Sequence, residues 1–222
     1  MENLLHLYFD KKNERQSIAI YLENQNLEHI TLIDKISVYY EGGLLLKLSW
    51  GTFRSTIEYD LRYMLKEALE GRLILDESIK KNLGFYYIQY HKNNKRKNLK
   101  YRLDEDGNSI WVGFKYQIYS PAYSSEQSSW LYNDTDGNII FEITPNYPWF
   151  FTGAEKGEVV IGYSQWMKSY HPYVVRIIKR EVVEQWIKQL DELIEKVAIN
   201  DEKWTCKGSG CEMCKQDMGV HY

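Results

Sequence analysis

The stretch from Lys35 to Gly71 decides the fold, and it reads KISVYYEGGLLLKLSWGTFRSTIEYDLRYMLKEALEG. Its first half predicts two β-strands, Lys35–Tyr40 and Leu44–Trp50. The glycine pair Gly42-Gly43 lies between them, and paired glycines favour the tight turn of an antiparallel hairpin. The first half of the stretch is therefore interpreted as a hairpin.

The second half of the same stretch predicts a helix. Ser55, with Glu58 three residues later, forms a capping-box pattern that marks a helix start. Gly71 supplies an end signal. Between them, six apolar residues recur at helical spacing and form one stripe: Ile57, Leu61, Met64, Leu65, Ala68 and Leu69. We expect this stripe to pack on the hairpin.

The rest of the chain repeats this mixture of strands and helices. Two similar turns, Asp104–Asn108 and Asp134–Asn138, contain the Asp-Gly pair typical of hairpins. The other expected elements are strands at Ser17–Leu22, Phe85–Tyr90, Ser109–Tyr119, Ile139–Ile143 and Tyr173–Lys179, short helices at Asp76–Asn82 (closed by Gly84) and around Ser164–Ser169, and a long helix from about Glu181 to Ala198. This order predicts an α+β fold with a largely antiparallel sheet packed by helices.

The 222 residues are interpreted as one α+β domain, residues 1–199, followed by a tail, residues 200–222. A subdivision near residues 91–102 is left open. Hydrophobic residues make up 44% of the chain, enough for a sizeable core. A polar hinge over Asn200–Lys203 is expected to separate the long helix from the tail.

The tail contains every cysteine of the chain. The spacing is C-x4-C-x2-C-x6-H, with the four candidate ligands Cys206, Cys211, Cys214 and His221. Zinc prefers four thiolate or imidazole ligands, and a C-x2-C pair can seat two of them. We expect either a short Cys-rich knuckle that binds a structural zinc ion or a reduced tail without metal.

A basic stretch lies in the middle of the chain, flanked by Tyr90 and Tyr101. Its cations are Lys92, Lys95, Arg96, Lys97, Lys100 and Arg102. Basic residues with neighbouring aromatic rings are typical of single-stranded nucleic-acid sites, and a solvated loop explains the same pattern. The formal net charge of −3 argues against a general polyanion binder.

An aromatic stretch, Thr144–Phe151, admits two interpretations. Its rings either fill the core or form a partner-binding surface, because tyrosine and tryptophan concentrate binding energy at interfaces. The candidate partner-binding residues are Tyr147, Trp149 and Phe150.

Catalytic motifs are missing from the sequence, so an enzyme is not favoured. An unrecognised hydrolase built on carboxylates and His171, which lies among aromatic residues, remains the alternative. No segment reaches the ~20 apolar residues of a membrane helix, so no membrane partner is expected. The absence of a signal-peptide pattern and the odd cysteine number favour a cytoplasmic protein.

The segments Ser129–Asp134 and Gly137–Pro145 resemble uncharacterised bacterial families of the kind that provide immunity against polymorphic toxins. The resemblance implies a bacterial, non-catalytic protein that neutralises a cognate toxin by direct binding, and it carries over no residue roles. We therefore expect a protein partner. The alternative is a nucleic-acid-associated protein that uses the basic stretch together with the zinc tail.

Overall fold

The computed structural model describes residues 2–204, without residues 11, 13, 24–29, 80–81, 93–98, 120–125, 150–152 and 155. Within these residues the protein has an α+β fold with antiparallel sheets and four α-helices. The predicted class is confirmed. The cysteine tail lies outside the described residues.

The first half of the chain forms a four-stranded antiparallel sheet in the order β1-β2-β3-β4. Its strands are β1 (Glu2–Tyr8), β2 (Ser17–Leu22), β3 (Lys35–Glu41) and β4 (Leu45–Thr52). The predictions for β2, β3 and β4 are confirmed, whereas β1 was not predicted. The β3–β4 connection is tight, since the Gly42 N–H donates to the Leu44 carbonyl over 3.0 Å.

The predicted helix follows β4 as two consecutive helical segments. Residues Arg54–Arg62 (η2) have π-helical geometry and Tyr63–Leu69 (α1) is α-helical. The capping box is wrong: the Ser55 N–H and hydroxyl both donate to Thr52, so Ser55 lies inside the helix instead of before it. The end signal is confirmed, because Gly71 has a φ angle of 69°, which glycine adopts most readily.

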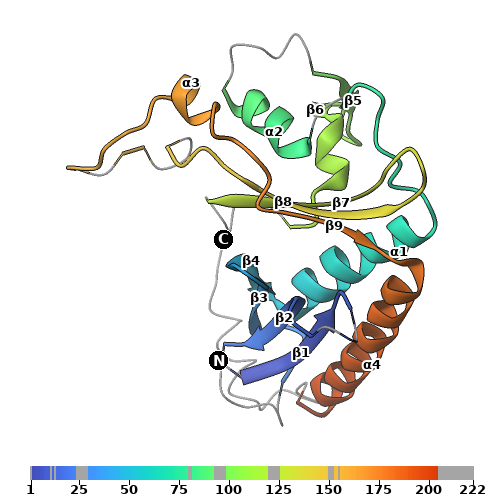
Figure 1. Cartoon of the computed structure of the whole chain (residues 1–222). Helices are drawn as coiled ribbons and strands as arrows, with labels where there is room; N and C mark the ends of the chain where they lie inside the picture. The colour runs from blue at the N-terminus through green and yellow to red at the C-terminus, as the bar shows by residue number, and fades with distance from the viewer. Residues whose placement is uncertain are drawn as a thin grey trace.

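The long C-terminal helix α4 (Arg180–Trp204) packs beside α1 on one face of the four-stranded sheet (Figure 1). Arg62, the last residue of η2, forms an ion pair with Asp191 of α4. The apolar face of α4 is buried at Val183, Leu190 and Val197. The expected hinge at Asn200–Lys203 is wrong, since the helical backbone continues through it to Trp204.

The second half of the chain is built around a three-stranded sheet in the order β7-β8-β9 and a separate hairpin. The strands are β7 (Gln127–Asn133), β8 (Ile139–Pro145) and β9 (Val174–Ile178), and the hairpin is β5 (Tyr101–Leu103) with β6 (Ser109–Trp111). The two Asp-Gly turns close β5–β6 and β7–β8 in the same way, because Asp104 and Asp134 each accept the backbone N–H four residues later. The predicted strand Ser109–Tyr119 is too long, because a 3-10 helix, η4 (Val112–Tyr116), replaces its middle.

Helix α2 (Leu83–His91) overturns two predictions, the helix Asp76–Asn82 and the strand Phe85–Tyr90. The Asn82 side chain accepts the Phe85 N–H over 2.8 Å, so it caps a helix that starts where the earlier one was expected to end. Leu83, Tyr87 and Ile88 are then buried at helical spacing. Aromatic residues have a high strand propensity, and here tertiary burial overrides it. A further short helix, α3 (Tyr163–Trp166), confirms the expected one.

Asn82 holds two elements at once, and its removal should destabilise the protein. Its Oδ1 atom accepts the Phe85 N–H and also the Tyr170 hydroxyl, over 2.8 and 2.7 Å. We expect Asn82→Ala to lower the free energy of unfolding by about 1–2 kcal/mol. Asn82→Asp keeps both acceptors and should cost less than half as much. Urea denaturation measures both values, and equal losses would contradict the capping role.

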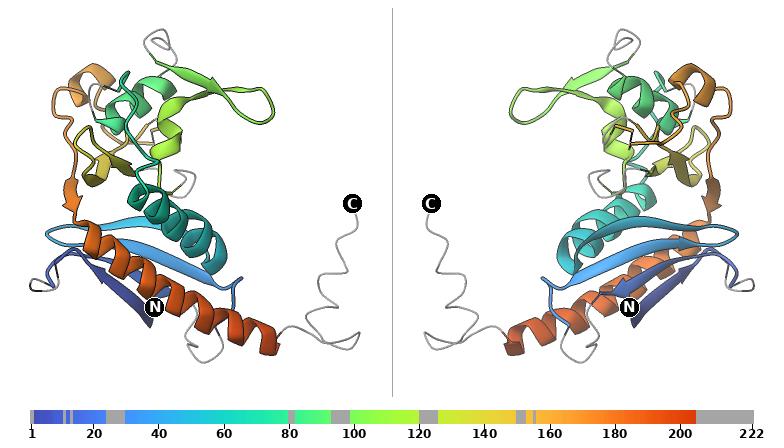
Figure 2. Two further views of the ribbon diagram at one scale, coloured as in Figure 1. Left: turned by 90° about the vertical axis from the view of Figure 1, so that its right-hand side faces the viewer. Right: turned by 90° about the vertical axis from the view of Figure 1, so that its left-hand side faces the viewer.

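The β7–β9 sheet lies between the four-stranded sheet and α2 (Figures 1 and 2). All seven residues of β8 are buried. On one face the Phe9 ring contacts Phe141 of β8 and Trp186 of α4, with ring centroids 5.7 and 5.0 Å apart. On the other face Trp130 of β7 lies 5.5 Å from the Tyr87 ring of α2. This sheet therefore joins the two halves of the molecule.

Candidate interaction surfaces

The four candidate zinc ligands, Cys206, Cys211, Cys214 and His221, lie outside the described residues. The zinc site stays a prediction. Among the described residues, no group of three or more His, Cys, Asp or Glu side chains is placed to hold a metal ion.

Two described cations of the basic stretch, Lys92 and Lys100, have partners within the protein. The Lys92 ammonium lies 3.1 Å from the centroid of the Tyr163 ring. Lys100 forms a 2.8 Å ion pair with Asp76, which lowers the pKa of that carboxyl to about 2. Arg102 is exposed on β5, while Lys95, Arg96 and Lys97 lie outside the described residues. The described part of the stretch thus stabilises α2 and its surroundings.

The aromatic stretch and the start of the basic stretch meet at α3. Tyr147 is 9% exposed, and its ring has edge contacts with Trp149, Tyr163 and Trp166 at centroid distances of 5.2–5.6 Å. Its hydroxyl donates to the Ile161 carbonyl. Tyr163 is also the ring that receives Lys92. Phe150 lies outside the described residues. Tyr147 is therefore the centre of a packed aromatic cluster.

The alternative hydrolase would need an imidazole close to a carboxylate. His171 is exposed, and its Nδ1 atom lies 2.9 Å from the Ser169 carbonyl. The buried carboxyl in this half is Glu142, 1% exposed, which accepts the Tyr132 hydroxyl over 3.0 Å. Burial raises the pKa of Glu142 to about 7, and the Tyr132 hydrogen bond partly opposes this. None of the described contacts joins Glu142 to His171.

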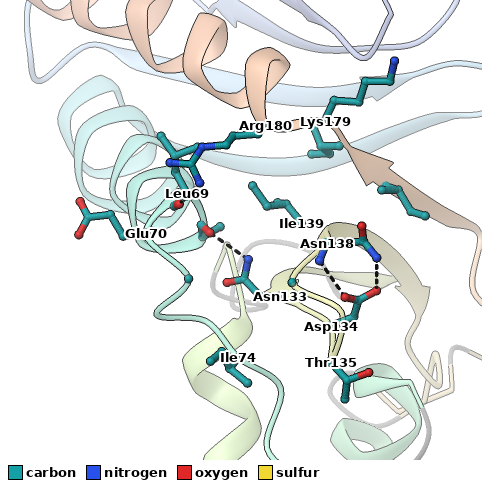
Figure 3. Close-up of a pocket in the computed structure, with 15 residues that line it drawn as sticks. Leu69, Glu70, Ile74, Asn133, Asp134, Thr135, Asn138, Ile139, Lys179 and Arg180 are labelled. Carbon is teal, nitrogen blue, oxygen red and sulfur yellow. Dashed lines mark hydrogen bonds between the residues drawn. The ribbon is translucent and has the colours of Figure 1, made fainter.

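A groove of about 490 Å³ lies where the end of α1, the β7–β8 turn and the β9–α4 junction meet (Figure 3). Two of its polar side chains donate to the backbone, whereas the Asn133 Oδ1 atom is buried without a hydrogen-bond partner among the described residues. The Asn133 side-chain amide donates to the Ala68 carbonyl over 2.9 Å, and Arg180 donates to the Leu69 carbonyl over 2.8 Å. The Arg180 bond satisfies the Leu69 carbonyl at the end of α1, whereas the Ala68 carbonyl also accepts the Gly71 N–H over 3.1 Å.

Asp134, on the opposite wall of this groove, also forms hydrogen bonds within the protein. Its carboxylate accepts the Asn138 N–H and side-chain amide over 2.8 and 2.9 Å, as Figure 3 shows. These hydrogen bonds, with the side-chain amide first, hold the pKa of Asp134 below its usual value. The floor of the groove is thus apolar, and the side chains of Asp134 and Arg180 at its rim form hydrogen bonds within the protein. No acid–base pair is assembled from the described residues that line it.

The face of the four-stranded sheet opposite α1 and α4 has a different character. Odd-numbered residues of β2 and β3 point to it, because the even-numbered ones form the core. We call it the tyrosine face, and it consists of His6, Tyr8, Tyr21, Tyr39, Glu41, Lys47 and Trp50 around the small residues Ser17, Ala19 and Ser37. Among the described residues, no helix or strand lies over this face (Figure 1).

The side chains of the tyrosine face hold one another in place. The His6 and Tyr8 rings stack with centroids 5.6 Å apart, and Tyr21 contacts both His6 and Tyr39 edge-on. The Tyr21 hydroxyl donates to Glu41 over 2.6 Å, and this bond is the main cause that raises the pKa of Tyr21 to about 12. The array is therefore ordered before any partner arrives.

The charges of the tyrosine face are arranged in two groups. The carboxylates are Glu41 on β3, which accepts the Tyr21 hydroxyl, and Glu23 directly after β2, which accepts the Ser37 hydroxyl. The lysines lie toward β4, where Lys47 is above the Tyr39 ring and Lys35 above the Trp50 ring, 5.9 and 4.9 Å from their centroids. Carboxylates among the rings disfavour phosphate and favour a basic side chain of a partner.

Sequence reasoning did not single out the tyrosine face. The alternation of Tyr39 with Val38 and Tyr40 predicted a strand, but both sets of side chains are bulky and aromatic or apolar. Only the location of α1 and α4 decides which set remains uncovered. A usable signal was the alternation Ser17, Ala19, Tyr21 against Ile18, Ile20, Leu22, which marks the less apolar face.

Comparisons of the chain with protein-family models, with curated proteins and with solved structures find no match. Among the described residues, no helix has the length and apolarity required to cross a bilayer.

Proposed function

We propose that this protein is a non-catalytic binding protein of the immunity type, which neutralises a cognate toxin through direct contact at the tyrosine face. The observation that carries the proposal is the ordered array of Tyr8, Tyr21 and Tyr39 on a sheet face without a described covering element.

Three physical properties support a protein as the partner. Tyrosine and tryptophan side chains bury a large area at a small entropic cost, and they dominate binding hot spots. The mutual contacts of Tyr21, Tyr39 and Glu41 reduce the ordering cost further, because these side chains are already fixed. The apolar residues Leu44 and Leu45, 48% and 69% exposed, extend the surface at the β3–β4 turn.

The partner suited to this face presents a basic side chain among apolar ones. Glu41 is partly exposed: one of its oxygens accepts the Tyr21 hydroxyl, and the other lies 3.6 Å from His6 Nδ1, so an arginine or lysine of the partner would approach this carboxylate beside the imidazole. A charge-assisted bond formed among aromatic rings is stronger than one in open solvent. The nucleic-acid alternative receives less support, because Lys92 and Lys100 have internal partners.

The function is tested by co-expression with the product of the neighbouring gene. We expect a stable complex and relief of growth inhibition, and we expect the double variant Tyr21→Ala, Tyr39→Ala to weaken the complex at least ~100-fold. Tyr59→Ala is the matched control, since Tyr59 is 58% exposed on η2, away from the tyrosine face. Binding is measured by calorimetry on the purified pair.

Two outcomes would contradict the proposal. If no complex forms and growth inhibition persists, the immunity function is wrong. If a complex forms but the double variant and Tyr59→Ala bind alike, the function stands and the tyrosine face is the wrong surface. A salt-sensitive affinity for single-stranded DNA, lost on Lys100→Ala and Arg102→Ala, would favour the nucleic-acid alternative.

A further inference from the structure

Strand β9 has an unusual distribution of polarity. Val174 and Ile178 are 6% and 3% exposed, whereas Tyr173, Val175 and Ile177 are 42%, 49% and 65% exposed. Burial alternates along the strand as expected, but polarity does not, because the outward positions are also apolar. A solvated strand face normally carries polar residues there. This apolar strip is exposed among the described residues, and such exposed strips are typical of binding surfaces.

The same strand is the edge of its sheet. The order is β7-β8-β9, so β9 has a strand on one side only. The opposite edge, β7, is bridged at Asn133 by Ile74 and at Trp130 by Gln117, while no such bridge to β9 occurs among the described residues. An edge strand presents backbone N–H and C=O groups that can pair with another strand. The exposed apolar residues therefore lie on a strand whose outer edge is unpaired among the described residues.

The charges at this edge are positive. Arg176 donates to the Gln16 side chain and to the Val175 carbonyl, and it has no ion pair with a described carboxylate. Lys179 follows at the end of the strand and likewise forms no ion pair with a described residue. Ile177 and Lys179 both line the groove at the β9–α4 junction (Figure 3). The edge is therefore apolar on one face and cationic on the other.

We propose that the edge of β9 binds an extended segment of a partner protein in which apolar and acidic residues alternate. Such a segment would add a fourth strand to the sheet. Its apolar side chains would lie beside Tyr173, Val175 and Ile177, and its carboxylates beside Arg176, because side chains alternate between the faces of a strand. This site is separate from the tyrosine face, so it does not depend on the function proposed above.

A second copy of the chain is a poorer occupant of this edge. Antiparallel pairing of two β9 strands about their centre would place Arg176 of each directly opposite the other. Like charges that face each other across a strand pair destabilise the pairing. The acidic segment replaces this repulsion with attraction.

The test uses the full chain and two fluorescent seven-residue peptides, one alternating valine with glutamate and the other valine with lysine. We expect fluorescence anisotropy to show saturable binding of the glutamate peptide and at least ~10-fold weaker binding of the lysine peptide. Ile177→Lys and Val175→Lys should each weaken binding of the glutamate peptide at least ~10-fold. Ile33→Lys is the matched control, with a side chain 70% exposed in the turn before β3, outside both proposed surfaces.

Each remaining outcome would overturn the proposal. These outcomes are failure of the glutamate peptide to bind, equal affinity for the two peptides, and equal weakening by Ile33→Lys and Ile177→Lys. A wild-type dimer that Ile177→Lys dissociates in analytical ultracentrifugation would assign the edge to a second copy instead. Circular dichroism melting checks that the variants, all at exposed positions, are folded.

Discussion

Gly84→Ala is expected to destabilise the protein by about 2–3 kcal/mol, although alanine is the better helix former by about 1 kcal/mol. Gly84 is the second residue of α2, and a Cβ atom there would overlap the Thr144 side chain and the Tyr170 hydroxyl. Thr144 is fully buried in β8 and accepts the Trp130 indole N–H over 2.9 Å. It cannot move aside without breaking this bond, so the overlap must displace α2.

The measurement is the free energy of unfolding in urea, with Gly43→Ala as the control. Gly43 lies in the β3–β4 turn, and a Cβ atom there meets nothing within 4 Å. We expect this control to change stability by less than about 0.5 kcal/mol. If Gly84→Ala were neutral or stabilising, helix propensity would outweigh packing, and the close approach of α2 to β8 would be incorrect.

Gly84 also shows why the sequence predicted some elements and missed others. Strands β2, β3 and β9 are short runs rich in β-branched and aromatic residues, which local patterns reveal, and α4 has a long apolar stripe. Around Gly84 the local signals mislead, since a glycine indicated a helix end and the following aromatic run favoured a strand. The contact between Gly84 and Thr144 joins residues 60 positions apart in the sequence, and no local pattern contains it.

The candidate sites were also hard to predict, because they depend on contacts between residues that are distant in the sequence. The sequence identified Lys92 and Tyr147 as separate candidates, and the fold brings them to the same ring, Tyr163. Cationic and aromatic residues with such partners stabilise the fold, and the sequence does not distinguish them from binding residues. The surfaces proposed here, the tyrosine face and the edge of β9, are defined by what covers a sheet, which depends on how distant segments pack.

Glu142→Gln is expected to stabilise the protein by about 2–3 kcal/mol at pH 8 and by almost nothing at pH 4. Glu142 lies on β8 between Trp130 and Val175, and one of its buried oxygens has no hydrogen-bond partner. Burial raises its pKa from 4.5 to about 7 in the folded state. Each pKa unit corresponds to about 1.4 kcal/mol, so the ionised carboxylate costs about 3 kcal/mol in the fold relative to the unfolded chain.

The sign follows from proton uptake. The folded state holds a proton on Glu142 up to about pH 7, whereas the unfolded chain loses it near pH 4.5, so this residue's favourable contribution is lost as the pH rises between these values. Glutamine imitates the protonated form, keeps an acceptor for the Tyr132 hydroxyl and removes the titration. The difference between variant and wild type should therefore increase from pH 4 to pH 7 and remain constant above it.

Asp60 requires a control, because burial also raises the pKa of its carboxyl, to about 6, so it titrates in an overlapping range. Asp60→Asn should give a smaller pH-dependent gain, and the double variant should show the sum of both, since Asp60 lies on η2 and Glu142 on β8. Denaturation at five pH values separates the two curves. A gain from Glu142→Gln that does not change with pH would mean that the pKa of Glu142 is the same in the folded and unfolded states, so that burial does not raise it.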